Sequence, residues 1–261
     1  MQALVAYLPN FLLILCRITA FFVVAPVFAT RSIPAQWKIG LASLIAFTVF
    51  AASGRSTIMP MDGQYVLLVL RETLVGLLLG FVAQLFFTVV QIAGAVIDIQ
   101  MGLGIANVID PMTGAQSPIM GNFKFIVAML LFLTFNGHHY LIDGIMRSYE
   151  WIPLDRESFA RIVQGGVSDF LVSSLDDVFA LSLQMAAPVV VSLFLTDVGL
   201  GILAKTAPQF NIFVVGLPVK IIVGFLALAI ALPGMLVWFQ DWFRSLFEAM
   251  DKLARLIGAQ P

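Results

Sequence analysis

Charged residues are scarce in this sequence of 261 residues. Asp, Glu, Lys and Arg make up 11% of it, whereas hydrophobic residues make up 61%. A soluble globular protein carries about 25% charged residues, so this composition excludes an ordinary soluble domain and indicates an integral membrane protein. The formal net charge of -1 lacks the basic excess that nucleic-acid binding requires. The single cysteine, Cys16, cannot form an intrachain disulfide, and we interpret it as a small buried hydrophobe.

Residues typical of metal or catalytic sites are equally few. The two histidines, His138 and His139, precede Asp143, and His139 and Asp143 share a helix face because they are four residues apart. No third ligand stands at a defined spacing, so we predict no metal site, no cofactor and no catalytic residue. We interpret Asn136-Gly137 instead as a helix start or turn, with histidines that hydrogen-bond to neighbours. No basic residue precedes Arg17, so we expect insertion through the first apolar span rather than through a cleavable signal peptide.

Six apolar stretches dominate the rest and predict an all-α membrane protein, a single polytopic domain over residues 1–261. They are uneven: the second has roughly 14 residues, below the roughly 20 needed to span a bilayer, and the third would be about 48 Å long as a helix. We therefore expect some helices to extend beyond the membrane or not to cross it. If all six cross, both chain ends lie on one side, and a weak excess of Lys and Arg places that side inside the cell. The stretches cover residues 4–28, 39–52, 66–97, 123–145, 175–204 and 212–239, and an amphipathic tail covers 241–255.

The segment from Gln100 to Phe123 fits neither lipid nor water. Its four glycines and two prolines exclude a continuous helix, yet many of its side chains are apolar. Irregular backbone at membrane depth is tolerated only where protein buries it or where it lines a water-filled cavity. We therefore predict a pore lining or plug formed by Met101, Gly102, Gly104, Asp110, Pro111, Met112, Gly114, Pro118, Met120 and Gly121.

Six charged residues lie within or beside the apolar stretches, where charges are costly and tend to face a partner or water. An ion or proton path is one interpretation, and pairing between helices or between subunits is the one we favour. Arg71 and Glu72 are adjacent, so we expect them to need different partners. The spacing of Gly76 and Gly80 predicts a close helix contact. The charges that we expect to support assembly are Arg17, Glu72, Asp197 and Lys220; Arg71 and Asp98 complete the set.

Several of these residues together resemble a known family. The central segment carries Gln100-x-Gly102, Asp110-Pro111, Ser117-Pro118 and Gly121-Asn122-Phe123, and Asn136-Gly137-His138-His139 follows it. This block is similar to that of the flagellar biosynthetic protein FliR family, which includes the homologous export-apparatus subunit of type III injectisomes. The resemblance covers roughly residues 10 to 245. Further matching positions are Arg17, Pro26-Val27-Phe28, Glu72, Gly76, Gly80-Phe81, Gln91, Gly94, Ala207-Pro208-Gln209, Asn211 and Gly216.

The resemblance implies a function that composition does not. It implies a subunit of the protein-conducting export gate of a flagellar type III secretion system, in which helical hairpins assemble into a closed complex and a glycine-rich loop contributes to a plug. The implied partners are FliP-like and FliQ-like small membrane subunits, FlhB-like and FlhA-like export components, and exported unfolded proteins. The implied location is the bacterial inner membrane at the flagellar basal body, as a multi-pass protein in contact with lipid and not with nucleic acid.

The residues by themselves also fit a second class of protein. Broken helices and buried charges would also suit a small-solute or ion transporter. Against this alternative, the sequence shows neither an inverted repeat nor a clear polar cluster for a substrate.

Overall fold

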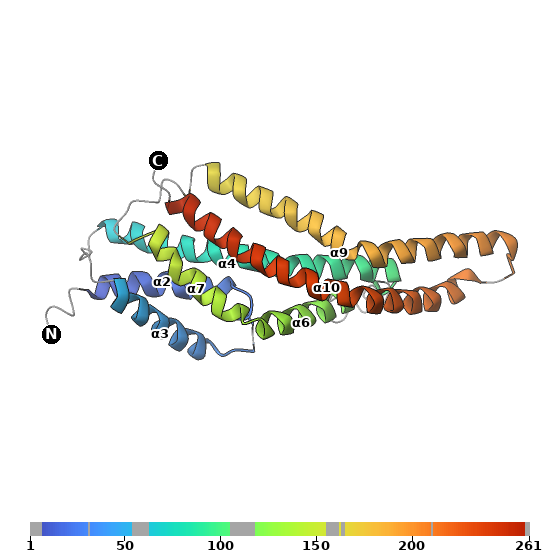
Figure 1. Ribbon diagram of the computed structural model, residues 1–261, viewed down its shortest axis with the longest axis horizontal. Helices are drawn as coiled ribbons and strands as arrows, with labels where there is room; N and C mark the ends of the chain where they lie inside the picture. The colour runs from blue at the N-terminus through green and yellow to red at the C-terminus, as the bar shows by residue number, and fades with distance from the viewer. Residues whose placement is uncertain are drawn as a thin grey trace. The chain divides into compact units, whose positions relative to one another are not determined.

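The computed structural model describes residues 7–30, 32–53, 63–104, 118–154, 162, 165–209 and 211–258. The regular elements in this part of the chain are α-helices, as Figure 1 shows, and the all-α fold class predicted from the sequence is confirmed. The helices are α2 (Leu8–Val24), α3 (Ala35–Ser53), α4 (Gly63–Met101), α6 (Ile119–Thr134), α7 (Gly137–Trp151), α9 (Gly165–Thr206) and α10 (Ile212–Gly258).

Four of these helices, α3, α4, α9 and α10, are long and apolar enough to cross a membrane. The α6 and α7 pair passes the same test only when it is counted as one broken span, and α2 is a shorter apolar helix. At about 1.5 Å per residue the 39 residues of α4 extend for roughly 58 Å. A hydrocarbon core is about 30 Å thick, so α4 either tilts strongly or continues beyond it.

The helices begin and end where hydropathy alone does not place them. The helix α3 begins at Ala35, before the apolar stretch 39–52, because Gln36 and Lys38 are good helix formers that a hydropathy profile ignores. For the same reason α9 includes the amphipathic stretch before residue 175, and α10 runs on through the amphipathic tail to Gly258. Three prolines, Pro188, Pro218 and Pro233, lie inside α9 and α10.

The apolar stretch 123–145 is broken at Asn136. This residue adopts a left-handed conformation with φ of 58°, which asparagine tolerates better than most residues. The helix α6 ends at Thr134, and α7 begins at Gly137. The backbone N–H of His139 donates to the carbonyl oxygen of Asn136 at 2.9 Å. The helix start predicted at Asn136-Gly137 is therefore present.

The chain divides into two compact units. Unit 1 consists of residues 1–85, 135–174 and 244–261, and unit 2 consists of residues 86–134 and 175–243. The helices α4, α9 and α10 each contribute residues to both. The single membrane domain over residues 1–261 stays a prediction.

In unit 1, α2 packs closely against α4 at the predicted small-residue pair. A Cβ atom on Gly76 would overlap the backbone carbonyl oxygen of Arg17, and one on Gly80 would lie 3.0 Å from the carbonyl oxygen of Phe21. On another face of α2, the rings of Phe11 and Phe50 meet edge to face, with centroids 6.0 Å apart, and join α2 to α3. The two glycines thus allow α4 to approach the backbone of α2.

The end of α10 also belongs to unit 1, where it packs on α7. A Cβ atom on Gly258 would overlap the carbonyl oxygen of Trp151, and the Met250 side chain lies against Gly144. The Arg255 guanidinium stacks over the Trp151 ring, 4.5 Å from its centroid. The apolar face of the amphipathic tail is buried by these contacts.

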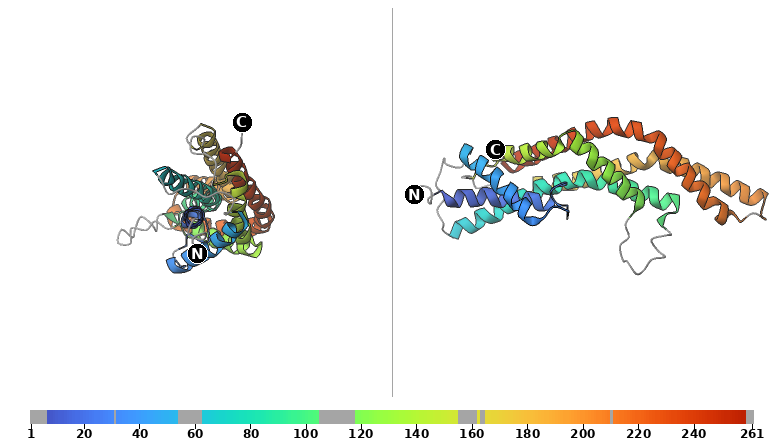
Figure 2. Two further views of the ribbon diagram at one scale, coloured as in Figure 1. Left: turned by 90° about the vertical axis from the view of Figure 1, so that its left-hand side faces the viewer. Right: turned by 90° about the horizontal axis from the view of Figure 1, so that it is seen from below.

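Unit 2 has an aromatic core and a helical hairpin. The Phe132 ring meets Phe87 and Phe243 edge to face, at centroid distances of 5.3 and 5.1 Å. The parts of α9 and α10 that belong to this unit lie side by side, as Figure 2 shows, and the Leu200 side chain reaches to 3.2 Å from the position of a Cβ on Gly216. The hairpin turns between Thr206 and Ile212.

The close contact at Gly76 predicts that a larger residue at this position lowers the stability of the protein. Replacing Gly76 with alanine should force α4 away from α2 and destabilise the protein by roughly 1–3 kcal/mol, the usual effect of overpacking. The matched control is Gly40→Ala in α3, where nothing lies within 4 Å of the new methyl group, so stability should be kept or slightly raised. Thermal unfolding of the detergent-extracted protein measures both changes, and equal melting temperatures would contradict the close contact.

Candidate functional site at the buried charges and the central segment

Arg17 is the centre of a buried polar network in unit 1. Its side chain is 0% exposed, and its Nε and Nη2 atoms donate to the two carboxylate oxygens of Glu72 at 2.6 and 3.0 Å. The guanidinium also donates to the Ser148 hydroxyl at 3.0 Å and to the carbonyl oxygen of Ile152 at 2.8 Å. A bidentate pair of this kind is directional as well as strong, so Arg17 holds α2 against both α4 and the end of α7.

Glu72 is shared between two arginines, which corrects one expectation from the sequence. Arg71 binds the same carboxylate: its Nη2 atom donates to Glu72 at 2.6 Å and to the carbonyl oxygen of Leu154 at 3.1 Å. The arginine side chain is long enough to fold back onto the next residue of its own helix. The second positive charge is balanced in part by main-chain carbonyl dipoles and, for Arg17, by the Tyr149 ring 3.9 Å away.

Asp197 joins three helices of unit 2. Its carboxylate accepts from Lys220 of α10, at 2.9 Å and 3.0 Å to its two oxygens, and from the Gln100 amide near the end of α4 at 3.2 Å. The four assembly charges selected from the sequence therefore form two intrachain pairs, Arg17 with Glu72 and Asp197 with Lys220. Their role in assembly stays a prediction.

The central segment leaves α4 through a glycine cap. Gly102 has φ of +80°, its N–H donates to the carbonyl oxygen of Ile99 at 3.1 Å, and the N–H of Leu103 donates to that of Asp98 at 3.0 Å. This pair of hydrogen bonds is the Schellman motif, which ends a helix at a left-handed residue. Glycine at position 102 is needed for that conformation.

The segment enters α6 through the side chain of the same Asp98. The buried carboxylate accepts from the backbone N–H of Met120 at 2.9 and 3.1 Å and from that of Gly121 at 3.4 Å. These amides belong to the first turn of α6, where N–H groups have no partner within the helix and where negative charge is favoured. A Cβ on Gly94 would overlap the Cα of Gly121, so the backbones are also in close contact there. Asp98 therefore takes part in both ends of the central segment.

The predicted plug residues fall into two groups. Met101, Gly102, Gly104, Pro118, Met120 and Gly121 are described, and among them Met101, Met120 and Gly121 are buried in unit 2. Asp110, Pro111, Met112 and Gly114 lie outside the described residues. The sequence interpretation did not select Asp98 for this site. Its position could have indicated this role, because Asp98 is an acidic residue near the end of an apolar helix, four positions before Gly102. A charge is costly there unless it accepts specific hydrogen bonds.

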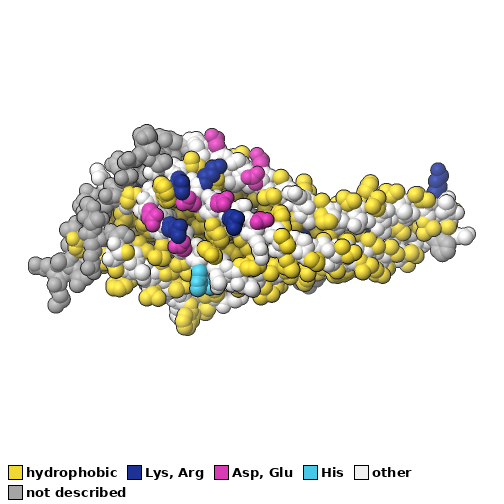
Figure 3. All heavy atoms as spheres, viewed as in Figure 1, with side chains coloured by type: hydrophobic (Ala, Val, Ile, Leu, Met, Phe, Trp, Pro, Cys, Tyr) yellow, Lys and Arg dark blue, Asp and Glu magenta, His cyan; other side chains and the backbone are white. Residues whose placement is uncertain are grey.

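A charged groove of about 340 Å³ lies in unit 1 between α7 and the end of α10. Two exposed ion pairs border it, Asp143 with Arg147 and Asp251 with Arg255, each at 2.8 Å and four residues apart on its helix. Figure 3 shows that acidic and basic side chains gather on one part of the visible surface, while much of the rest is hydrophobic. The rings of His138 and His139 meet edge to face with centroids 4.2 Å apart, and in the described part of the chain no three His, Cys, Asp or Glu residues form a metal-binding group.

The sequence matches a known protein family over most of its length. Residues 8–246 match the model of the family described as bacterial export proteins, family 1. The chain belongs to this family. The match spans both units, and it includes the Arg17–Glu72 pair, Asp98 and the whole central segment.

Individual relatives in the family share most of the chain. It is 43% identical over 258 residues to the flagellar biosynthetic protein FliR of Bacillus subtilis, covering 99% of each chain. It is 32% identical over 253 residues to FliR of Escherichia coli, covering 95% of this chain and 92% of the relative. It is 26% identical over 250 residues to the Yop proteins translocation protein T of Yersinia pestis, covering 95% and 94%. None of these three relatives is named as a solute transporter.

The sharing of Glu72 by two arginines predicts which substitution in the network lowers stability more. Glu72→Gln leaves two guanidinium groups facing a neutral amide, whereas Arg17→Ala leaves Glu72 paired with Arg71. Breaking a buried pair costs roughly 3–5 kcal/mol, so both variants should lower stability and assembly, and Glu72→Gln should lower them more. The control is Arg147→Ala, whose side chain is 66% exposed and whose pair contributes at most about 0.5 kcal/mol. The yield and melting temperature of the extracted protein are the measurements, and wild-type values for both buried variants would contradict the role of the network.

Asp98 gives a second prediction for this site. Asp98→Ala removes the acceptor for the first turn of α6 and should destabilise the protein by about 1.5–3 kcal/mol, the usual worth of hydrogen bonds to a charged group. Asp98→Asn keeps one acceptor oxygen and should lose less. Limited proteolysis between α4 and α6 and thermal unfolding report the change. Wild-type behaviour of the alanine variant would show that the carboxylate does not hold the end of the segment.

Proposed function

We propose that this protein is a subunit of the protein-conducting export gate of a flagellar type III secretion system, needed for gate assembly and for export of flagellar proteins. The observation that carries the proposal is family membership over nearly the whole chain, on a fold with several membrane-length helices. Identity is 43% to a flagellar relative and 26% to the Yop translocation relative, which favours the flagellar system. The protein is placed in the bacterial cell membrane as a multi-pass subunit of the basal body.

The proposed partners are other membrane subunits of the same apparatus. We place FliP-like and FliQ-like small subunits in direct contact with the chain, FlhB-like and FlhA-like components next to it, and unfolded export substrates in the conduit. Support comes from the helices of unit 2, which expose many large hydrophobic side chains that lipid or partner helices must cover. Examples are Phe194, Leu195, Ile202, Phe213, Ile222 and Ile230.

We also propose that the protein acts without catalysis of its own. The buried Arg17–Glu72 pair and the Asp197–Lys220 pair hold helices together, and each carboxylate is engaged by its partners. The transporter alternative would use such charges to bind a solute or ion. Their mutual engagement favours a structural role, as does a family of export proteins.

The central segment is the proposed plug of the conduit. Its two ends are anchored, one by the glycine cap at Gly102 and the other by the bonds from Met120 and Gly121 to Asp98. Met101 and Met120 are buried at these anchors, so the apolar residues between them, such as Met112, are the ones proposed to close the opening. An apolar constriction excludes water and ions by dewetting.

One experimental series tests both parts of this proposal. The tagged chain, extracted in mild detergent from cells that make the whole apparatus, should bring down the small membrane subunits, and its loss should abolish export of flagellar proteins. A deletion of residues 105–114, which spares Gly102 and Asp98, should give an assembled complex that conducts ions in a planar bilayer. Met112→Asp should conduct less than the deletion but more than the intact complex, because a charge wets an apolar constriction.

The controls separate the two parts. Gln209→Asp adds the same charge at the turn of the α9–α10 hairpin and should conduct no more than the intact complex. A solitary chain or homo-oligomer that moves a small solute would contradict the export function. An assembled deletion complex that conducts no more than the intact one would leave the export function in place and refute the plug.

A further inference from the structure

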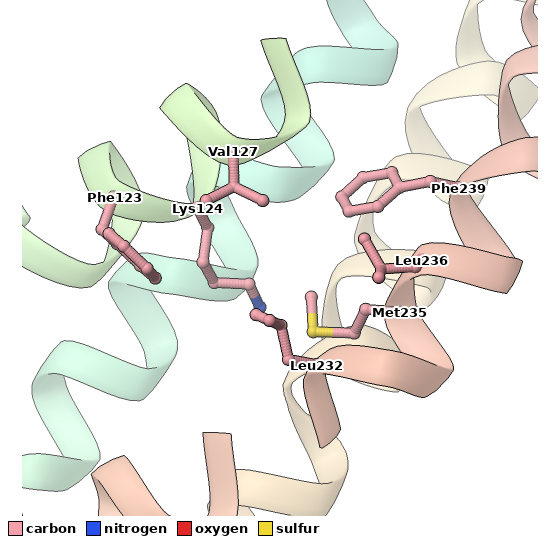
Figure 4. Close-up of a pocket in the computed structure, with 7 residues that line it drawn as sticks. All are labelled: Phe123, Lys124, Val127, Leu232, Met235, Leu236 and Phe239. Atoms are coloured by element: carbon pink, nitrogen blue, oxygen red, sulfur yellow. The ribbon is translucent and has the colours of Figure 1, made fainter. Parts of the chain in front are cut away.

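Lys124 is a buried cation without a partner in unit 2. It lies in the second turn of α6, its side chain is 3% exposed, and its Nζ atom has no hydrogen-bond partner among the described residues. Figure 4 shows the side chain extending from α6 toward α10, with its amine nitrogen beside Leu232 and Met235. Charged groups inside a membrane protein normally pair or face water, so this amine requires an explanation.

The crevice around the amine does not supply one. Its volume is about 10 Å³, and besides Lys124 its lining consists of apolar side chains: Phe123, Val127, Leu232, Met235, Leu236 and Phe239. That volume is about the minimum for one water molecule. A buried water needs two to four polar partners, and this lining offers it one. Water alone therefore leaves the ammonium group poorly satisfied.

Two carboxylates of unit 2 are engaged by other groups. Asp98 accepts from the backbone amides of Met120 and Gly121, and Asp197 accepts from Lys220 and Gln100. Neither forms an ion pair with Lys124 in the described structure. No described carboxylate pairs with Lys124, which leaves a neighbouring molecule as a source of one.

We propose that Lys124 binds a carboxylate carried by a membrane helix of a neighbouring subunit that packs across α6 and α10. The inference rests on the proposed function in so far as such subunits surround this chain. A side-chain carboxylate brings two oxygen atoms, and the ammonium group can donate to both, whereas a lipid phosphate brings further oxygens for which this apolar lining has no donor. The surface beside the crevice is uncovered and apolar, as expected where another helix packs. It includes Phe123, Ile126 and Leu130 of α6 and Leu236 and Val237 of α10.

The arrangement gives the interface one attractive charge contact within an apolar surface. Apolar packing alone tolerates sliding of one helix along another, whereas a single buried ion pair sets one register. Lys124 would therefore select the correct neighbour and its position along the membrane normal. A neighbour without an acid at that height would leave the ammonium group unpaired, which disfavours wrong partners.

The test uses the full chain in the intact apparatus. Lys124→Met keeps the length and removes the charge, so the chain itself should fold at least as well while recovery of neighbouring membrane subunits with it falls by about tenfold. Lys124→Glu should abolish recovery, because it places like charges together. Lys205→Met, an exposed lysine at the end of α9, should recover the neighbours as the wild type does. The abundance of each variant in the membrane shows that the chain is still inserted.

Selection for restored motility in Lys124→Glu cells identifies the partner. The expected revertants replace an Asp or Glu with Lys or Arg in a membrane helix of another subunit. Full recovery of neighbours by Lys124→Met would overturn the proposal. It would also be overturned if native mass spectrometry showed that Lys124→Met loses a bound phospholipid and no subunit, which would assign the site to a headgroup. Failure of the wild-type chain to recover any other membrane subunit would refute the proposed function and this contact with it.

Discussion

The bilayer interior offers no water, so the polar groups of a membrane chain must find their partners within protein. In unit 1 this constraint is met by one carboxylate, that of Glu72, which two guanidinium groups share. Further donors of those arginines reach the Ser148 hydroxyl and the carbonyl oxygens of Ile152 and Leu154. The network explains how α2, α4 and the end of α7, far apart in the sequence, stay together although lipid solvates their apolar faces as well as protein does.

Small residues and charges act together in this packing. Gly76 allows the α4 backbone to approach the carbonyl oxygen of Arg17, the same residue whose side chain binds Glu72 one turn away. A similar combination occurs in unit 2, where Gly94 lies against Gly121 and Asp98 accepts from the Gly121 amide. Close backbone approach shortens the distance that a short carboxylate side chain must reach, so each glycine makes the neighbouring polar contact feasible.

The central segment owes its place to the helices that border it. The Schellman cap at Gly102 ends α4, and the Asp98 carboxylate satisfies the first turn of α6. Asp98 contributes an acceptor at each border, through its main-chain carbonyl oxygen to the Leu103 amide and through its carboxylate to the Met120 and Gly121 amides.

Much of the fold could be predicted from the sequence, because it depends on local properties of the chain. Apolar composition indicates a membrane protein, helix formers without strand alternation indicate helices, Asn136-Gly137 predicts a helix start, and the ordered motifs indicate the family. The partners of the charges could not be predicted in the same way. Three features depend on which helix faces meet: Arg71 turns back to Glu72, Asp98 reaches an amide 22 residues later, and the Lys124 amine finds no hydrogen-bond partner among the described residues. Contacts between helix faces are decided by close packing of segments that are distant in the sequence. A local pattern of hydrophobic and polar residues does not encode which faces come into contact.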